Sequence, residues 1–130
     1  MRRVMFIKEG SIKLEEIEIG DELVNLQNSV NGIIEIPYIS EKLYENKIDI
    51  VINEEGKLMD LCPTIAVIDK ETNETLDLLV GNVLFTGFTE EGETVGLTDE
   101  QCNIIKESLE CVLYRDNSSN EMDVMYALRI

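Results

Sequence analysis

The chain has 130 residues, of which 27 are acidic and 11 basic, so its formal net charge is −16, and histidine is absent. The length suits one domain, and a hydrophobic fraction of 44% is ordinary for a globular protein. The absence of histidine excludes Ser-His-Asp and Cys-His catalysis and every histidine-containing metal site. The acidic residues are spread along the chain, which argues against direct binding to nucleic acid or to anionic membranes, since both need clustered lysine and arginine.

The sequence also bears on the compartment. No apolar run approaches the ~20 residues of a membrane-spanning helix, and the stretch 4–7 is shorter than the roughly 7–15 residues of a signal-peptide core. Cys62, Cys102 and Cys111 are an odd number of cysteines without C-x-x-C spacing, which indicates reduced thiols and neither a disulfide framework nor a zinc site. We therefore expect a cytoplasmic protein without a cofactor.

The N-terminal part predicts a hairpin followed by a helix. A short apolar run indicates a strand over 4–8, and a period-two pattern, broken at Glu15-Glu16 by a possible bulge, indicates one over 12–19. Asp21 is the expected N-cap of a helix over 22–30, which ends at Asn31-Gly32 because glycine tolerates the left-handed conformation there. One apolar face of this helix would carry Leu23, Leu26, Gln27 and Val30.

The middle of the chain predicts short strands separated by polar segments. Strands are expected over 33–38, with Pro37 at an edge or an end, and over 48–53. The polar stretch 40–47 indicates a loop. The pattern at 65–68 fits a strand or a helical turn, and a further strand is expected over 82–88.

A second helix is predicted to begin after Thr98, because Thr98 and Gln101 have the spacing of a capping box. We expect it to end near Tyr114 and to place Cys102 and Cys111 on opposite faces. A loop over 115–120 follows, and 121–130 fits an edge strand or a last helix, with alternation favouring the strand. The apolar residues at helical spacing are Cys102, Ile105, Leu109 and Val112.

Together these elements predict one α+β domain over 1–130, in which a small mixed, mostly antiparallel sheet packs against two or three helices. The order of short motifs between about residues 4 and 110 resembles the bacterial and phage family known only as domain of unknown function 3846. The resemblance implies a setting on phages, plasmids and integrated elements, a C-terminal extension at about 115–130, and no reaction. The motifs are Leu23, Leu26, Gln27, Val30 and Gly32, then Ile34-Glu35, N-E-E-G-K-L at 53–58, Asp77 with Gly81, and L-T-D-E-Q at 97–101.

The candidate binding loop consists of Asn53, Glu54, Glu55 and Lys57, which offer oxygen ligands and one cation. The alternative is a tight hairpin turn in which Gly56 takes a positive φ. No catalytic, cofactor-binding or metal-binding residue is assigned. The stretch 69–80 is similar to a calcium loop but lacks glycine at its sixth position and glutamate at its twelfth.

We therefore expect a small non-enzymatic binding or accessory protein of mobile-element type that acts through protein–protein contact. One alternative is an inhibitor that mimics the charge of DNA and occupies a host defence protein or another nucleic-acid-binding protein. The other is a small-ligand-binding protein or enzyme that uses carboxylates in a cleft. A basic protein is the partner that the net charge favours, and the oligomeric state is left open.

Overall fold

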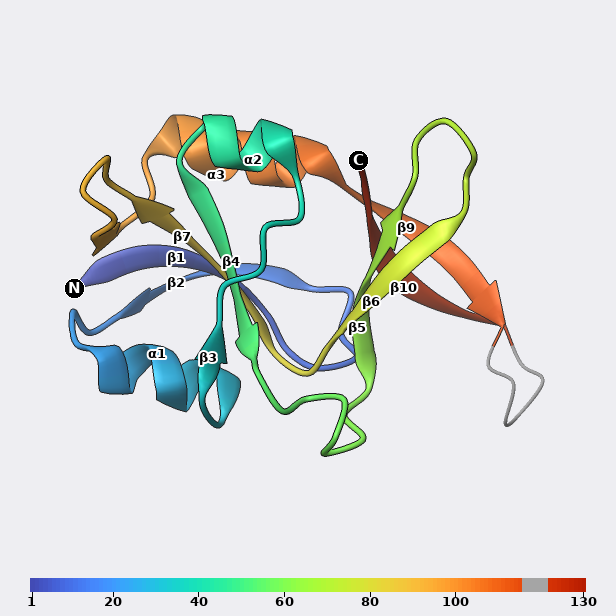
Figure 1. Ribbon diagram of the computed structural model, residues 1–130, viewed down its shortest axis with the longest axis horizontal. Helices are drawn as coiled ribbons and strands as arrows, with labels where there is room; N and C mark the ends of the chain where they lie inside the picture. Colours follow the sequence, from blue (N-terminus) through green and yellow to red (C-terminus); the bar gives the residue numbers. More distant parts are fainter. Residues whose placement is uncertain (116–121) are drawn as a thin grey trace.

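The computed structural model describes residues 1–115 and 122–130, which form two sheets and three helices (Figure 1). The helices are α1 (Leu23–Val30), α2 (Glu41–Glu45) and α3 (Asp99–Ser108). The first sheet contains β1 (Arg2–Ile7), β2 (Leu14–Ile19), β3 (Ile34–Glu35), β4 (Ile48–Asn53), β7 (Val83–Phe88) and β8 (Thr94–Val95). The second contains β5 (Pro63–Ile68), β6 (Thr75–Val80), β9 (Leu109–Arg115) and β10 (Met122–Arg129).

The strand order is β2-β1-β7-β4-β3 in the first sheet, with β8 beside β7, and β6-β5-β10-β9 in the second. All strand pairs are antiparallel except β5 and β10. The structure therefore confirms the expected α+β class with a mostly antiparallel arrangement.

The first sheet is buried on both faces. On one face α1 covers it, and the buried side chains there are Val4, Leu26, Val30, Val51 and Leu84. On the other face α2, α3 and the second sheet enclose the larger core (Figure 1). Burial on both faces explains why β1, β4 and β7 are rich in consecutive apolar residues. The largest side chains of the larger core are Met5, Ile7, Ile65, Leu79, Phe85, Ile105 and Leu128.

Helix α1 occupies the predicted segment and ends at Val30 as predicted, but it begins one residue later. Its N-cap is Glu22 and not Asp21, because the backbone N–H of Glu22 donates to Asn25 Oδ1 at 3.0 Å. Asn31 ends the helix in the left-handed conformation, with φ of 62°. Leu23 is 57% exposed, so it does not share the buried face of this helix as predicted.

The predicted loop over 40–47 is wrong, because it contains α2. Ser40 is the N-cap, and its hydroxyl accepts a hydrogen bond from the backbone N–H of Leu43 at 3.2 Å. Burial of the Leu43 side chain in the larger core holds this short helix in place. The strand expected over 33–38 shortens to the two residues of β3, since Pro37 has no N–H to donate.

The capping box of α3 is confirmed. The Gln101 N–H donates to Thr98 Oγ1 at 3.1 Å, and the Thr98 N–H donates to Gln101 Oε1 at 2.9 Å. The predicted end near Tyr114 is wrong, because the helix ends at Ser108 and the next residues form β9. Cys102 is buried in α3, whereas Cys111 lies exposed in β9, so the two do not share a helix.

Strand β10 confirms a strand for the C-terminal segment, but not an edge strand. It lies between β5, to which it runs parallel, and β9, to which it runs antiparallel. The predicted extension at 115–130 therefore supplies a central strand of the second sheet. Of the loop expected over 115–120, Arg115 belongs to β9, and 116–120 lie outside the described residues.

Candidate functional site

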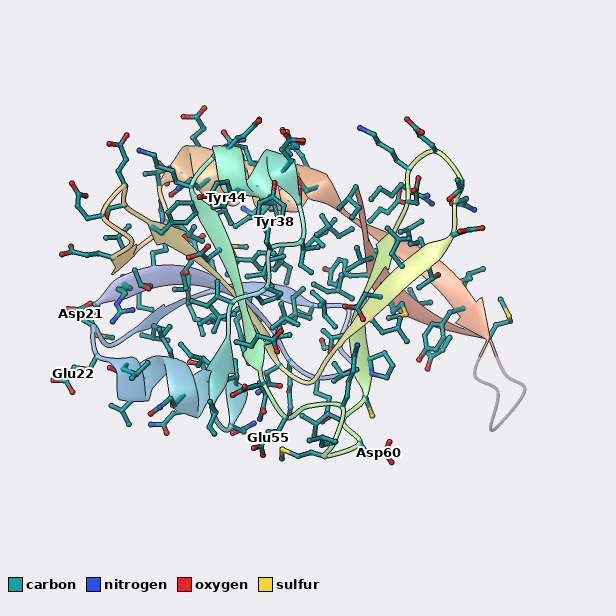
Figure 2. All side chains as sticks on the ribbon, in the orientation of Figure 1. Asp21, Glu22, Tyr38, Tyr44, Glu55 and Asp60 are labelled. Atoms are coloured by element: carbon teal, nitrogen blue, oxygen red, sulfur yellow. The ribbon has the colours of Figure 1, made fainter. Side chains whose placement is uncertain are left out.

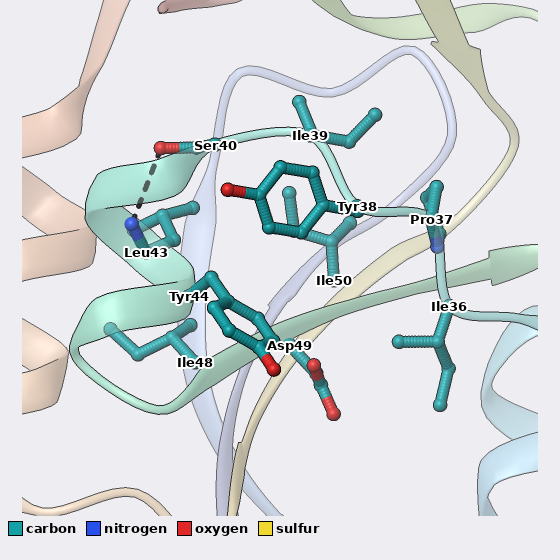
Figure 3. A pocket seen from close by; sticks show the side chains of 10 residues that line it. All are labelled: Ile36, Pro37, Tyr38, Ile39, Ser40, Leu43, Tyr44, Ile48, Asp49 and Ile50. Carbon is teal, nitrogen blue, oxygen red and sulfur yellow. Dashed lines mark hydrogen bonds between the residues drawn. The ribbon is translucent and has the colours of Figure 1, made fainter.

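A gap opens at the edge of the first sheet beside β4. Strand β3 pairs only Ile34 with Asn53 and Glu35 with Ile52, and the chain then turns away at Pro37. The first residues of β4 therefore have no strand on that side. A hollow of about 90 Å³ lies in the gap, and Figure 3 shows the segment from Ile36 to Ser40 arching across it.

Three aromatic rings lie at the end of this gap next to α2, which we call its upper end. The rings of Tyr38 and Tyr44 meet edge to face with centroids 5.3 Å apart, and the Tyr44 ring lies 5.3 Å from that of Phe88. Tyr38 is 65% exposed and Tyr44 is 53% exposed. Tyr44 and Asp49 line the first hollow (Figure 3). They also line a second hollow of about 550 Å³, which lies beside Tyr44 and Phe88.

Asp49 gives this end an uncompensated negative charge. It is half-buried, burial raises the pKa of its carboxyl group, and none of the described residues forms an ion pair with it. Its cross-strand neighbour Thr86 has a buried hydroxyl without a hydrogen-bond partner among the described residues. The nearby Lys47 does not compensate Asp49, because its ammonium pairs with Glu90 at 3.3 Å.

Two further hollows, of about 130 and 450 Å³, lie at the lower end between the loop after β4 and the strand β6. Pro37 lies between them and the gap, because it lines both the smaller of these hollows and the hollow beside β4. Exposed leucines surround this end, with Leu58 89%, Leu76 53% and Leu78 37% exposed. We call the four neighbouring hollows the groove.

Three of the four predicted binding-loop residues line the groove, namely Asn53, Glu54 and Lys57. Asn53 is only 3% exposed and serves the fold. Its amide donates to the carbonyls of Val30 at 3.1 Å and Asn31 at 3.3 Å, and its oxygen accepts from the N–H of Glu55 at 2.8 Å. Lys57 pairs with Asp77 of β6 at 2.7 Å.

The hairpin alternative for this loop is wrong, because β4 and β5 belong to different sheets. The positive φ falls on Asp60, at 56°, and not on Gly56. Gly56 is required for another reason, since a Cβ there would lie 2.9 Å from Val80 Cγ2. Figure 2 shows Glu55 and Asp60 on this loop, Tyr44 on α2 and Tyr38 near this helix.

Sequence reasoning missed Tyr38, Tyr44, Asp49 and Phe88. They come from the segment after β3, from α2, from β4 and from β7, so no spacing in the sequence joins them. The helical wheel of the segment 41–45 could have separated buried Leu43 from exposed Tyr44. The tertiary structure alone brings the three rings together.

Carboxylates dominate the charge of the groove. Its two lysines are Lys47 and Lys57, and each already pairs with a carboxylate. Such a site favours a ligand that carries positive charge together with apolar side chains. The six acidic residues that line the groove are Glu35, Glu45, Asp49, Glu54, Asp77 and Glu90.

The described part of the chain offers neither a metal site nor a membrane-spanning helix. It holds no group of three or more Cys, Asp or Glu residues that could bind a metal ion. None of its helices has the length and apolar character needed to cross a membrane.

Comparison with known proteins identifies a family whose function is unknown. No curated protein and no solved structure matches the chain. The model of one family, described as Domain of unknown function (DUF3846), matches residues 1–110. Strand β10 lies beyond the matched segment, although it is central to the second sheet. Because the match covers most of the chain, this protein belongs to the DUF3846 family.

Proposed function

We propose that the protein is a non-enzymatic binding protein whose groove holds an extended segment of a partner protein that carries both basic and apolar side chains. The observation that supports this most strongly is that the hollows follow one another across the surface. Adjacent hollows share Tyr44 and Asp49 at one end, Pro37 in the middle, and Lys57 with Asp77 at the other. A row of neighbouring, partly aromatic hollows fits an extended segment better than a compact small molecule.

The chemistry of the lining indicates what the segment contains. Exposed Tyr38, Tyr44, Leu76 and Leu78 would contact its apolar side chains. Tyrosine is enriched among the residues that contribute most to binding energy at protein interfaces. The unpaired Asp49 would attract lysine or arginine, and the net charge of −16 would speed association with a basic partner. The mobile-element setting and the cytoplasmic location stay predictions.

The test begins with a defined probe. A phage-displayed library of random dodecapeptides is selected on the immobilised protein, and the best peptide is synthesised with a fluorescent label. We expect the selected sequences to combine apolar residues with Lys or Arg, and their affinity to fall as the salt concentration rises. Absence of any enriched peptide would overturn the proposal.

Variants then place the binding site. Tyr44→Ala should weaken binding of the labelled peptide, measured by fluorescence anisotropy, by about tenfold or more, as expected for an interface anchor. Leu23→Ala is the matched control, because Leu23 is similarly exposed but lies on α1 away from the groove. Equal affinities of the two variants would contradict the groove as the site. The DNA-mimic alternative predicts binding that depends on carboxylates and is insensitive to Tyr44→Ala.

A further inference from the structure

The strand β6 forms one wall of the lower part of the groove. Each of its residues, from Thr75 to Val80, lines one or both of the lower hollows. Strand β6 is also an edge strand, since β5 pairs with it on one side only. Its free edge presents backbone groups that no strand satisfies, which makes it a template for an added strand.

The direction of these backbone groups follows from one hydrogen bond. The N–H of Gly81 donates to the carbonyl of Cys62 at 2.9 Å, on the side of β5. Alternate residues of an antiparallel strand direct their N–H and C=O groups to the same side. Asp77 and Leu79 therefore point toward β5, whereas Leu78 and Val80 point away from it.

The side chain of Asp77 occupies the unpaired edge of β6 at Leu78. The N–H of Leu78 donates to Oδ1 of Asp77 at 2.8 Å, and the same oxygen accepts from Nζ of Lys57 at 2.7 Å. The Lys57 ammonium, together with the Leu78 N–H, holds the pKa of Asp77 below its usual value. The Lys57 side chain is 66% exposed and that of Asp77 is 42% exposed, and ion pairs open to solvent are weak, so this cover can open at low cost.

We propose that the partner segment adds a strand to the free edge of β6 and pairs with the backbone groups of Leu78, while Asp77 moves from the Leu78 N–H to a lysine or arginine of the segment. This inference rests on the proposed function and names its binding mode. Exposed Leu76 and Leu78 would receive apolar side chains of the added strand. A second copy of this chain fits the edge poorly, since each copy carries a net charge of −16.

The first test leaves the protein unchanged. Two versions of the selected dodecapeptide carry N-methyl groups at alternate residues, one at the odd positions and one at the even positions. Only one set of N–H groups in an added strand faces β6. Each lost hydrogen bond weakens binding by about 2- to 10-fold. We expect one version to bind at least tenfold more weakly and the other within about twofold of the parent peptide, and equal losses would overturn strand addition.

The second test removes the N–H of Leu78. Leu78→Pro and Leu78→Ala both delete the leucine side chain, but only proline also deletes the N–H and places ring atoms at the edge. Pairing with β5 does not use this N–H, so both variants should show the circular dichroism spectrum of the wild type. We expect Leu78→Pro to bind the dodecapeptide at least tenfold more weakly than Leu78→Ala, and equal affinities would contradict the proposal.

The combined results separate the two proposals. If Tyr44→Ala weakens binding while neither the methylated peptides nor the Leu78 variants differ, the groove binds the segment and strand addition is wrong. If no peptide is selected, both proposals fail. If light scattering shows a wild-type dimer that Leu78→Pro disrupts, a second copy occupies the edge of β6, and the inference of a partner segment is overturned.

Discussion

Asn53 is expected to be essential for stability, although it belongs to the loop that sequence reasoning assigned to binding. Its side chain makes three hydrogen bonds with backbone groups, two to the carbonyls at the end of α1 and one from the N–H of Glu55. At about 1 kcal/mol each, with an added cost for the groups left unpaired, Asn53→Ala should lower the free energy of unfolding by about 2–4 kcal/mol. For a chain of this length that corresponds to a loss of roughly 10 °C in Tm.

The assay is urea unfolding followed by circular dichroism. Asn103→Ala is the matched control, because Asn103 is exposed on α3 and its replacement should change stability by less than about 0.5 kcal/mol. Asn53→Asp keeps the acceptor oxygen but cannot donate, so it should be at least as destabilising as Asn53→Ala at pH 7. If Asn53→Ala unfolds at the same urea concentration as the control, the structural role that we assign to this amide is wrong.

Four further predictions follow from the fold. Gly32→Ala should lower the free energy of unfolding by about 1–3 kcal/mol, because the added Cβ would lie 2.7 Å from Asn53 Nδ2. A double-mutant cycle should show a smaller loss when the same substitution is made in the Asn53→Ala variant. Asp49→Asn should stabilise the protein in urea unfolding at pH 7. The pKa of Asp49 is raised in the folded state, so the wild type loses stability as the pH rises from the ordinary pKa of 3.8 through the pKa of the folded protein. The difference in the free energy of unfolding between the variant and the wild type should therefore grow over that pH interval and then level off. Thr98→Ala should lower the free energy of unfolding by about 1 kcal/mol through loss of the cap on α3, and an unchanged urea midpoint would contradict this. A chain that ends at Arg115 should show no cooperative thermal transition, since β5 and β9 would lose the strand between them.

The candidate site was predictable only in part. The motif at 53–58 located one wall of the groove, because glycine and polar residues at a strand end mark a loop wherever it occurs. The other walls were not predictable, since β6 faces this loop only after two sheets have packed against each other. The sequence also did not show which loop residues serve the fold. Asn53 is buried and structural whereas Lys57 lies at the surface, and this difference in burial is set by the tertiary structure.

What the sequence determined by itself was local. Short apolar runs located β1, β4 and β7, and the capping box located the start of α3, because both signals depend on residues a few positions apart. Tertiary structure decided whether Leu109 to Tyr114 continued that helix, since the apolar spacing there fits either element and pairing with β10 selects the strand. The same pairing placed β10 in the centre of its sheet, because a strand's neighbours are set by contacts between distant segments and not by its own pattern.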